Sequence, residues 1–426
     1  MWIRIDRPFA VPTDVRQVIT TLTGAGFESY LVGGCVRDFL LNRSIKDYDI
    51  ATSARPDDVE RLFPKVLEIG RAFGVMKVIS EAGRPIEVAT FRTEKGYRDH
   101  RHPTHVQFTS VEEDSSRRDF TINAFYLDLK TSQVLDFHQG LEDLKNKLIR
   151  AIGDPNVRFQ EDALRLIRAH RFAARFGFQI EVGTRIAIEQ NAPLIRKISI
   201  ERVCSELEKI ITLPSSKQAV IDLEASGLFE NIMPEVSVAK LHQKKVWDQT
   251  LRVLSVLGAY DKIEPISFYW GLFLLPTIRL LPVEKRDAEA RKIAARLKLP
   301  NQCAEEMAYL VRETPKFSFA FTMREATLIR WMKEDGFELL MRFHALDAVS
   351  YDGNQAGLEF VSSLYPEMKK RFSLKPLITG EDLVKLGLSP GRQFSEILRT
   401  IEDLTFEGEL VEPAQALDYV LKYFVI

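Results

Sequence analysis

The segment Leu31–Ser53 reads LVGGCVRDFLLNRSIKDYDIATS and places a pair of glycines shortly before two aspartates that are two positions apart. The apolar residues before the glycines predict a short buried strand over residues 30–32, which Gly33 and Gly34 end. Paired glycines let backbone N–H groups approach an anion closely, and a helix beginning near residue 35 or 36 would point its positive end at the same place. The turn therefore predicts a phosphate-binding site, to which Arg37 would add a charge-assisted hydrogen bond.

The two aspartates belong to a second predicted strand, residues 47–51. Side chains two positions apart in a strand share a face, so Asp47 and Asp49 would point together, roughly 6 to 7 Å apart along the strand. Two carboxylates beside a phosphate cradle suit Mg²⁺ that itself holds a nucleoside triphosphate. Taken alone, each feature has a structural alternative, a tight turn for the glycines and a solvated strand face for the aspartates.

Length and composition set wide bounds. The 426 residues allow two or three domains, and 45% hydrophobic with 28% charged residues is typical of a soluble globular protein. The chain has 59 Lys and Arg against 60 Asp and Glu, so any RNA-binding surface must be local. The three cysteines, Cys35, Cys204 and Cys303, are far apart, which argues against a disulfide framework and fits a reducing cytoplasm.

Targeting and membrane segments are not expected. Arg4, Asp6 and Arg7 interrupt the N-terminus before any apolar run forms, which argues against a signal peptide. The most apolar stretch, residues 266–278, is too short to span a bilayer and contains Pro276. It therefore predicts a buried helix.

The pattern along the chain changes near residue 150. Before this point short strands, helices and turns alternate: we expect helices over residues 13–24 and 56–63 and a hairpin of residues 75–79 with 86–91. From about residue 155 onward the apolar spacing is almost wholly helical. The segment 93–105, TEKGYRDHRHPTH, is nearly free of apolar residues and carries Lys95, Arg98 and Arg101, so it predicts a mobile loop.

A further motif, EDALR at residues 161–165, lies on one face of a predicted helix over residues 158–175. Ion pairing within the helix is the structural reading, worth about 0.2 to 0.5 kcal/mol per pair. The functional reading is sharper. An arginine donor beside an aspartate acceptor, here Arg165 and Asp162, complements a base edge with a ring-nitrogen acceptor and an amino donor. Cytosine and adenine have such an edge, whereas uracil and guanine present the reverse order.

Several motifs in order, GGxVRD, DYDIATS, RRDFTINA at residues 117–124 and EDALR, resemble the class II branch of the polymerase-beta-like nucleotidyltransferases. This branch contains CCA-adding enzymes and bacterial poly(A) polymerases. The resemblance implies an α+β nucleotidyltransferase head with a small mixed sheet over residues 1–150, followed by an all-α neck, body and tail. The neck, residues 151–225, would carry the nucleobase-recognition helix, and residues 226–426 would form an RNA-binding, degenerate HD-like body and tail.

The same resemblance implies roles for individual residues. Asp47 and Asp49 would be catalytic and would hold two Mg²⁺ ions, with Glu87 as a third catalytic carboxylate on a neighbouring strand. The nucleotide-binding residues would be Gly33, Gly34, Arg37, Arg117, Arg118, Asp119, Asn123, Glu161, Asp162, Arg165 and Arg168. The expected reaction is attack of an RNA 3′-hydroxyl on the α-phosphate of CTP or ATP, with pyrophosphate released. The 3′ end of tRNA is the expected partner, and no obligate protein partner is inferred.

Departures from the family pattern keep alternatives open. Residues 70–78 keep the Gly, Arg and Phe of a poly(A) polymerase segment but lack its second Arg and its His, which favours a CCA-adding enzyme over a poly(A) polymerase. Enzymes that add only CC or only A remain alternatives, as does an RNA-binding module without catalysis. Gln139 replaces a glycine of the family's DxxGGxxDL motif. Arg202 and Glu206 of the ERxxxE pattern are interpreted as a structural brace of the neck.

Overall fold

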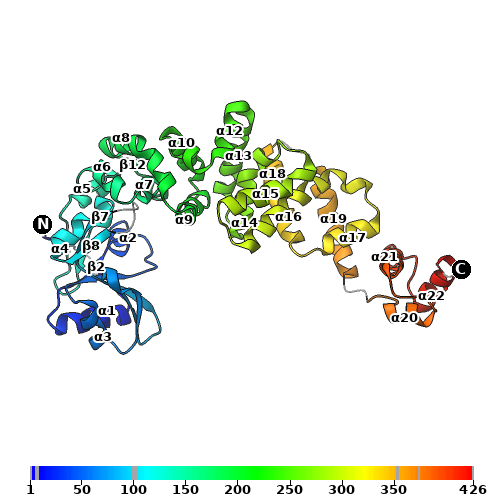
Figure 1. Ribbon diagram of the computed structural model, residues 1–426, viewed down its shortest axis with the longest axis horizontal. Coiled ribbons are helices and arrows are strands. Elements are labelled where there is room, and N and C mark those ends of the chain that lie inside the picture. Colours follow the sequence, from blue (N-terminus) through cyan, green and yellow to red (C-terminus); the bar gives the residue numbers. More distant parts are fainter. Residues whose placement is uncertain (1, 5–8, 98–102, 352–354, 373–374, 425–426) are drawn as a thin grey trace. The chain divides into compact units, whose positions relative to one another are not determined.

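The structure, a computed structural model, describes residues 2–4, 9–97, 103–351, 355–372 and 375–424. It divides into two compact units, Met1–Val238 and Ala239–Ile426 (Figure 1). The first unit holds both strands and helices and the second holds helices in its described residues. The predicted α+β head with helical regions after it is therefore confirmed, while the finer boundaries at residues 150 and 225 stay a prediction.

A mixed sheet forms the centre of the first unit, with eight strands in the order β1-β10-β9-β2-β3-β6-β5-β4. Neighbouring strands are antiparallel except β3 and β6, which run parallel. The predicted mixed sheet is thus confirmed. Its strands are β1 (Trp2–Arg4), β10 (Gln133–Leu135), β9 (Tyr126–Asp128), β2 (Ser29–Val32), β3 (Asp49–Thr52), β6 (Pro85–Thr90), β5 (Val75–Ile79) and β4 (Val66–Gly70).

The two central strands explain where the segment Leu31–Ser53 turns. Leu31 of β2 pairs with Ile50 of β3, and both side chains are fully buried. Gly33 ends β2 with a φ of 72°, a left-handed conformation that favours glycine, and helix α2 (Gly34–Leu40) starts directly after it. Because β2 ends at Val32, β3 has no partner on this side beyond Asp49. The predicted strand over residues 47–51 is therefore wrong at its start, and Asp47 lies just before β3.

The segment predicted as a mobile loop forms the arms of a hairpin. Strands β7 (Arg92–Tyr97) and β8 (Pro103–Phe108) pair antiparallel as a separate two-stranded sheet. Backbone pairing stabilises such a ribbon without an apolar face, so the low apolar content of the segment did not reveal it. Arg98 and Arg101, on which part of the loop prediction rested, lie outside the described residues.

Helices accompany the sheet and continue the first unit as far as α12, whose last residues belong to the second unit. They are α1 (Thr13–Gly24), α3 (Pro56–Leu62), α4 (Val111–Ser116), α5 (Gly140–Asn146), α6 (Pro155–Glu161), α7 (Leu164–Phe176), α8 (Val182–Asn191), α9 (Ile200–Ile211), α10 (Ser216–Ala225), α11 (Phe229–Ile232) and α12 (Pro234–His242), with 3₁₀ turns η1 (Arg71–Phe73), η2 (Thr121–Asn123) and η3 (Ala192–Lys197). Two short strands, β11 (Leu148–Ile149) and β12 (Gln179–Ile180), pair parallel. The region after residue 151 is thus helical apart from β12.

The second unit contains α13 (Lys244–Ala259), α14 (Ile266–Ile278), α15 (Val283–Arg296), α16 (Asn301–Glu313), η4 (Thr314–Thr322), α17 (Glu325–Lys333), α18 (Phe337–Tyr351), α19 (Ala356–Arg371), α20 (Gly380–Lys385), α21 (Arg392–Phe406) and α22 (Pro413–Tyr423). Nearly every residue of α14 is buried, which confirms the predicted buried helix. Among the described residues no helix has the length and apolarity needed to cross a bilayer.

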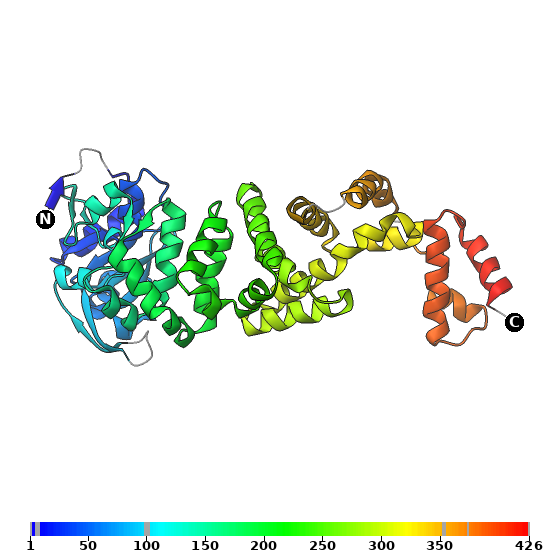
Figure 2. The same cartoon turned by 90° about the horizontal axis from the view of Figure 1, so that it is seen from above.

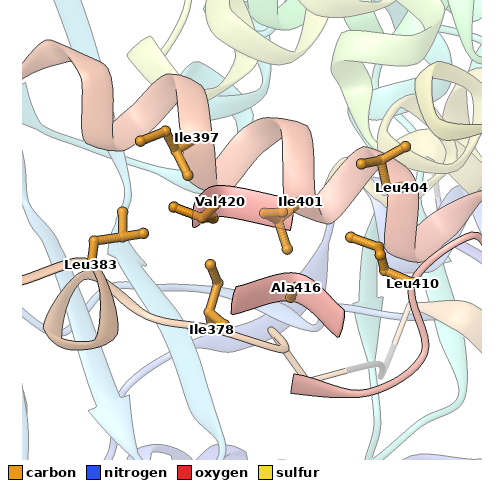
Figure 3. Close-up of a cluster of buried hydrophobic side chains, with 8 residues drawn as sticks. All are labelled: Ile378, Leu383, Ile397, Ile401, Leu404, Leu410, Ala416 and Val420. Atoms are coloured by element: carbon orange, nitrogen blue, oxygen red, sulfur yellow. The ribbon is translucent and has the colours of Figure 1, made fainter. Parts of the chain in front are cut away.

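The last three helices lie together near the C-terminus, orange to red in Figure 2, and they have a core of their own. Leu383 from α20, Ile397 from α21 and Val420 from α22 are each fully buried, and they pack together in one hydrophobic cluster (Figure 3). Removal of this apolar surface from water stabilises the group, at about 25 cal/mol per Å² buried.

Candidate active site

An open cleft of about 600 Å³ lies where the turn between β2 and α2, the start of β3 and helix α7 meet. All predicted site residues except Glu87 and Glu161 line this cleft. Its lining consists of Gly33, Gly34, Arg37, Asp47, Asp49, Arg117, Arg118, Asp119, Asn123, Asp162, Arg165, Arg168, Arg171, Phe172 and Arg175. Four sequence motifs, of which the first and last are more than 120 positions apart, therefore contribute residues to one polar site.

Three carboxylates influence one another at the edge of the cleft. Asp49 lies beside Glu87 in the parallel register of β3 and β6. Asp49 keeps contact with solvent on one side, but desolvation by the surrounding protein and the charges of Glu87 and Asp47 raise its pKa to about 6, against the opposing effect of Arg118. Such mutual repulsion is the condition that a bound cation relieves.

The residues fit a divalent cation that is shared with a substrate. Among the described residues no three Asp, Glu, His or Cys side chains form a complete metal-binding group. Magnesium, however, is commonly held by one or two carboxylates together with substrate phosphates and water rather than by an all-protein cage. Asp47 and Asp49, which both line the cleft, match that arrangement, whereas Glu87 does not line it.

The glycine turn and Arg37 hold the cleft in shape. Gly33 donates its backbone N–H to the carbonyl of Phe125 at 3.1 Å. The Arg37 guanidinium, only 4% exposed, donates to Asp38 at 2.7 and 2.9 Å and to the Asn123 side chain at 2.5 Å. Arg37 therefore lines the cleft with each of its three nitrogens making one hydrogen bond inside the protein, and one of these bonds positions Asn123.

Asp119 connects the third motif to helix α7. One of its oxygens accepts from the Asn123 amide at 3.0 Å, and the other accepts from Arg168 at 2.6 and 3.0 Å. Burial alone would raise the pKa of Asp119, but the Arg168 charge and the hydrogen bonds outweigh it and lower the pKa to about 2. Asp119 is thus ionised, and it holds the Arg168 guanidinium and the Asn123 amide at the cleft.

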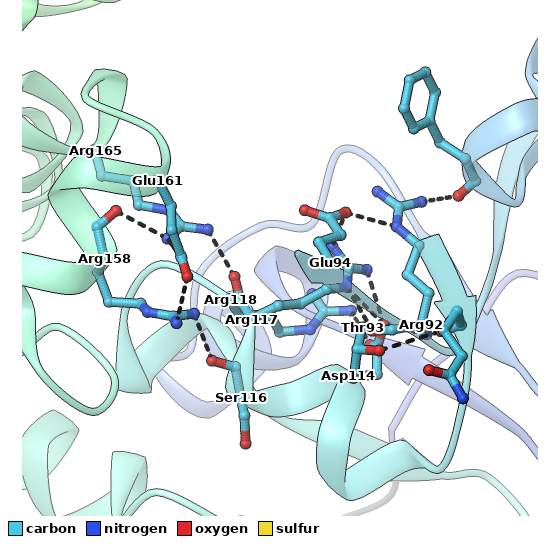
Figure 4. Close-up of polar contacts among 12 residues, drawn as sticks. Arg92, Thr93, Glu94, Asp114, Ser116, Arg117, Arg118, Arg158, Glu161 and Arg165 are labelled. Atoms are coloured by element: carbon cyan, nitrogen blue, oxygen red, sulfur yellow. Dashed lines mark hydrogen bonds and ion pairs between the residues drawn. The ribbon is translucent and has the colours of Figure 1, made fainter. Parts of the chain in front are cut away.

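Asp114, a fully buried residue that the sequence analysis did not single out, organises the two arginines of the same motif. It pairs with Arg117 at 2.8 Å and with Arg118 at 3.3 Å, and it accepts a 2.6 Å hydrogen bond from Tyr126. Figure 4 shows Asp114 beside Glu94, which also contacts Arg117 at 3.3 Å. The base of the β7–β8 hairpin is therefore tied to the site.

The EDALR motif lies at a break between helices, not inside one. α6 ends at Glu161 and α7 begins at Leu164, while Asp162 has an extended backbone with φ of -137° and ψ of 100°. The predicted continuous helix over residues 158–175 is therefore wrong at this point. Apolar spacing continues through the break, since Phe159 and Leu166 are both buried, so periodicity did not reveal it.

Asp162 lies in this break and Arg165 lies just after it, and neighbouring helices hold both side chains. Asp162 pairs with Arg202 of α9 at 3.0 Å, which agrees with the interpretation of Arg202 as a brace. Glu161 does not line the cleft but lies between Arg158, at 2.7 Å, and Arg165, at 3.0 Å (Figure 4). Arg165 also donates to the carbonyl of Arg117 at 2.7 Å. Glu161 thus positions Arg165.

Helix α7 brings three further residues to the cleft that the sequence analysis missed. Arg171, Phe172 and Arg175 follow Arg168 at spacings of three, four and seven, so they share its helical face. The Arg171 guanidinium lies 4.0 Å from the centroid of the Phe172 ring and pairs with Glu206 of α9 at 2.5 Å. Extending the helical spacing beyond Arg168 would have found all three.

Two further sequence features have a clear place. Gln139 adopts a left-handed conformation with φ of 59° before α5, a conformation that glycine adopts more readily than glutamine. In the predicted HD-like body of the second unit, Gln249 of α13 and Leu275 and Pro276 of α14 stand at the positions where an HD-type hydrolase would carry His and His-Asp. No group of metal-binding side chains occurs there in the described part of the chain.

Comparison with known proteins agrees with this site. Residues 29–150 match the family described as poly A polymerase head domain, and residues 177–240 match the family described as probable RNA and SrmB-binding site of polymerase A. The cleft residues up to Asn123 fall within the first match.

Whole-chain relatives and solved structures are more specific. A CCA-adding enzyme of Lactobacillus helveticus is 33% identical over 428 residues, which covers 99% of each chain. A CCA-adding enzyme of Enterococcus faecalis is 35% identical over 415 residues and covers 96% of this chain and 95% of that protein. The crystal structure of Bacillus stearothermophilus CCA-adding enzyme in complex with CTP matches 96% of this chain and 97% of that chain, with a TM-score of 0.72 and 27% identity. The chain therefore belongs to the CCA-adding enzyme family of RNA nucleotidyltransferases.

Proposed function

We propose that this protein adds the CCA sequence to the 3′ end of tRNA from CTP and ATP. The observation that carries the proposal is the single cleft that joins Asp47 and Asp49 to Asp162 and Arg165. A carboxylate pair for the reacting phosphate and an acceptor–donor pair for a base edge are the two parts that template-independent addition of C and A requires.

Each part of the cleft has a proposed task. Asp162 accepts from the amino group of cytosine or adenine and Arg165 donates to the ring nitrogen, while Arg118 and Arg168 bind phosphate oxygens. Asp119 holds Arg168, and Asp119 and Asn123 contact the ribose. Asp47 and Asp49 would hold Mg²⁺, which when bound favours ionisation of the attacking 3′-hydroxyl and offsets the charge on the departing pyrophosphate. The negative charge of Glu87 lies beside Asp49 and adds to the attraction of this aspartate pair for the cation.

The location proposed with this function is the cytoplasm. The three cysteines are each free and buried, as expected of a protein that works in a reducing compartment.

The direct test is incubation of the purified protein with Mg²⁺ and tRNA that lacks its 3′ CCA, followed by sequencing of the product ends. We expect CTP alone to give CC, and CTP with ATP to give CCA with no further addition. Long A tracts from ATP alone on varied RNAs would instead establish a poly(A) polymerase, and addition that stops at CC, or that adds only the terminal A, would establish a partial enzyme.

A pair of variants tests the carboxylates. Asp47→Asn with Asp49→Asn should lower incorporation at least 1,000-fold, because the cation loses both protein ligands, while affinity for tRNA stays within about twofold of wild type. Asp222→Asn, an exposed aspartate that accepts a hydrogen bond from Gln218, is the control and should retain full activity. Normal incorporation by the double variant would refute the assignment of the metal site.

A further inference from the structure

A solvent-accessible face of the sheet continues from the proposed catalytic carboxylates across β6 and β5. Burial alternates along both strands, so one face of each strand packs into the core and the other does not. On the accessible face, Glu87 of β6 is exposed and Lys77 of β5 is half-buried. The core face of the two strands consists of Met76, Val78, Ile86 and Val88.

The strand register aligns Lys77 with the carboxylates. Asp49 of β3 pairs with Glu87 of β6, and Glu87 pairs in turn with Lys77 of β5. Directly paired residues of neighbouring strands project to the same face of a sheet, so the three side chains form one row. Strands β3 and β5 are two spacings apart, roughly 9 to 10 Å, and lysine carries its ammonium on a long flexible stem. Lys77 therefore lies within reach of a substrate that is bound at Asp49 and Glu87.

The charge of Lys77 is not used in an ion pair. Among the described residues no carboxylate, Glu87 included, forms an ion pair with Lys77. Its partner on the other neighbouring strand is Leu67 of β4, which is apolar and 53% exposed. Val75 and Ile79, which share the face of Lys77 within β5, are apolar as well. Lys77 thus offers an ammonium to an anion beside the reaction centre.

The sheet order indicates which anion this is. The order β2-β3-β6-β5 places the glycine turn, at the end of β2, and Lys77 on opposite sides of β3. The cleft that we assign to the nucleoside triphosphate is lined by the glycine turn and several arginines, but not by Glu87 or Lys77. In phosphoryl transfer the attacking and leaving oxygens lie roughly in line, on opposite sides of the phosphorus. With pyrophosphate on the side of the glycine turn, the attacking RNA strand approaches from the side of β6 and β5.

We propose that Lys77 binds the phosphodiester between the last two nucleotides of the RNA substrate. This phosphate is one ribose away from the 3′-hydroxyl, so the contact positions the attacking oxygen beside Asp49 and Glu87. The triphosphate of the incoming nucleotide does not share this contact, because its phosphates belong to the glycine turn and the arginines of the cleft. The inference rests on the proposed function and names a residue that holds the RNA 3′ end for the same reaction.

The test measures a single addition. The full chain is incubated with Mg²⁺, tRNA lacking CCA and 3′-deoxy-CTP, which prevents a second addition, and KM is determined for both substrates. We expect Lys77→Gln to raise KM for tRNA about 3- to 10-fold and to change KM for 3′-deoxy-CTP by less than about twofold. Lys77→Arg keeps the charge and should remain near wild type. Lys130→Gln is the matched control, because Lys130 is exposed and follows the end of β9 that lies farthest from the glycine turn.

A neutral linkage identifies the phosphate that is contacted. A methylphosphonate in place of the last phosphodiester of the tRNA should raise KM for tRNA in wild type about as much as Lys77→Gln does. In Lys77→Gln the same linkage should have no further effect, because the contact is already lost. A methylphosphonate in the 5′ strand of the acceptor stem is the control and should affect both proteins equally. If Lys77 only balanced the charge of Glu87, the effects of the variant and of the last linkage would add instead.

Several outcomes would overturn the proposal. Equal KM for tRNA in wild type and Lys77→Gln would do so, as would additive effects of the variant and the last linkage. A rise in KM for 3′-deoxy-CTP alone would overturn it in favour of a contact with the triphosphate. Melting temperatures show that each variant is folded. If wild type extends tRNA and Lys77→Gln does so with equal KM, only the role of Lys77 fails, whereas the proposed function itself fails if wild type does not extend tRNA.

Discussion

At the scale of single residues, the raised pKa of Asp49 links the proposed metal site to the stability of the fold. Its pKa of about 6 lies above the usual value of 3.8. The folded protein thus binds this proton more tightly than the unfolded chain does. As the pH rises from about 4 to 6, the unfolded chain loses the proton first and stability falls. Above pH 6 the ionised carboxylate destabilises the fold until a cation binds.

The variant Asp49→Asn tests directly whether the ionised Asp49 carboxylate destabilises the folded protein. Without divalent ions at pH 8 the variant should be more stable than wild type, by at most about 1 kcal/mol because solvent screens this exposed carboxylate, which corresponds to a rise in Tm of about 1 to 3 °C. At pH 4 the difference should vanish, since Asp49 is then protonated in the folded protein. Mg²⁺ should raise the Tm of wild type only. Scanning calorimetry measures both effects, and a variant that melts below wild type at pH 8 would contradict the argument.

At the scale of secondary-structure elements, the break between α6 and α7 positions Asp162 and Arg165, the two residues that we propose select the nucleobase. Glu161, the last residue of α6, pairs with Arg165, which lies in the first turn of α7. Arg202 of α9 pairs with Asp162 in the break. Residues of three helices therefore hold the pair that we propose reads the base. Rigid supports of this kind are what a protein template needs in order to reject the wrong base.

Glu161→Gln should loosen Arg165 while leaving the cleft's carboxylates in place. Hydrogen bonds to charged groups contribute about 1.5 to 3 kcal/mol, so we expect discrimination between CTP and UTP, measured as the ratio of kcat/KM, to fall by about tenfold or more. Glu189→Gln in α8 is the control, since Glu189 is solvent-accessible and contacts Arg185 only at 3.9 Å. Unchanged discrimination in Glu161→Gln would show that Arg165 needs no such support.

The same element scale shows what the sequence could reveal and what it could not. Motif spacing predicted the β2–α2 turn, the hairpin of β5 and β6 and nearly all residues of the cleft, because glycine turns and alternating apolar residues act locally. It missed β1, β9 and β10, which have three residues each and pair in part with strands far away in the chain. It also missed β4, an edge strand with no buried residue. It also missed Asp114, because a buried carboxylate is recognisable only once Arg117 and Arg118 converge on it.

At the scale of the whole molecule, the chain consists of parts that bury separate cores. The catalytic cleft lies entirely within Met1–Val238, whereas the cluster around Ile397 lies near the other end of the chain. Arg330 of α17 pairs with Glu402 of α21 at 2.8 Å, and Arg324 and Glu407, which flank these two helices, pair at 2.8 Å. Surface pairs of this kind contribute little stability, so the last three helices depend mainly on their own apolar cluster.

Ile397→Ala should therefore unfold the C-terminal group locally. The fully buried side chain leaves a cavity, and such substitutions cost about 2 to 5 kcal/mol. Hydrogen exchange followed by mass spectrometry should show faster exchange across residues 378–424 and unchanged exchange in α2, β3 and α7. Leu421→Ala, at a side chain that is 45% exposed, is the matched control and should leave both regions unchanged. CTP affinity should be the same in all three proteins, because the nucleotide contacts belong to the first unit, whereas tRNA affinity should fall in Ile397→Ala if these helices touch the RNA. Faster exchange in α7 of Ile397→Ala would show instead that the two units share their stability.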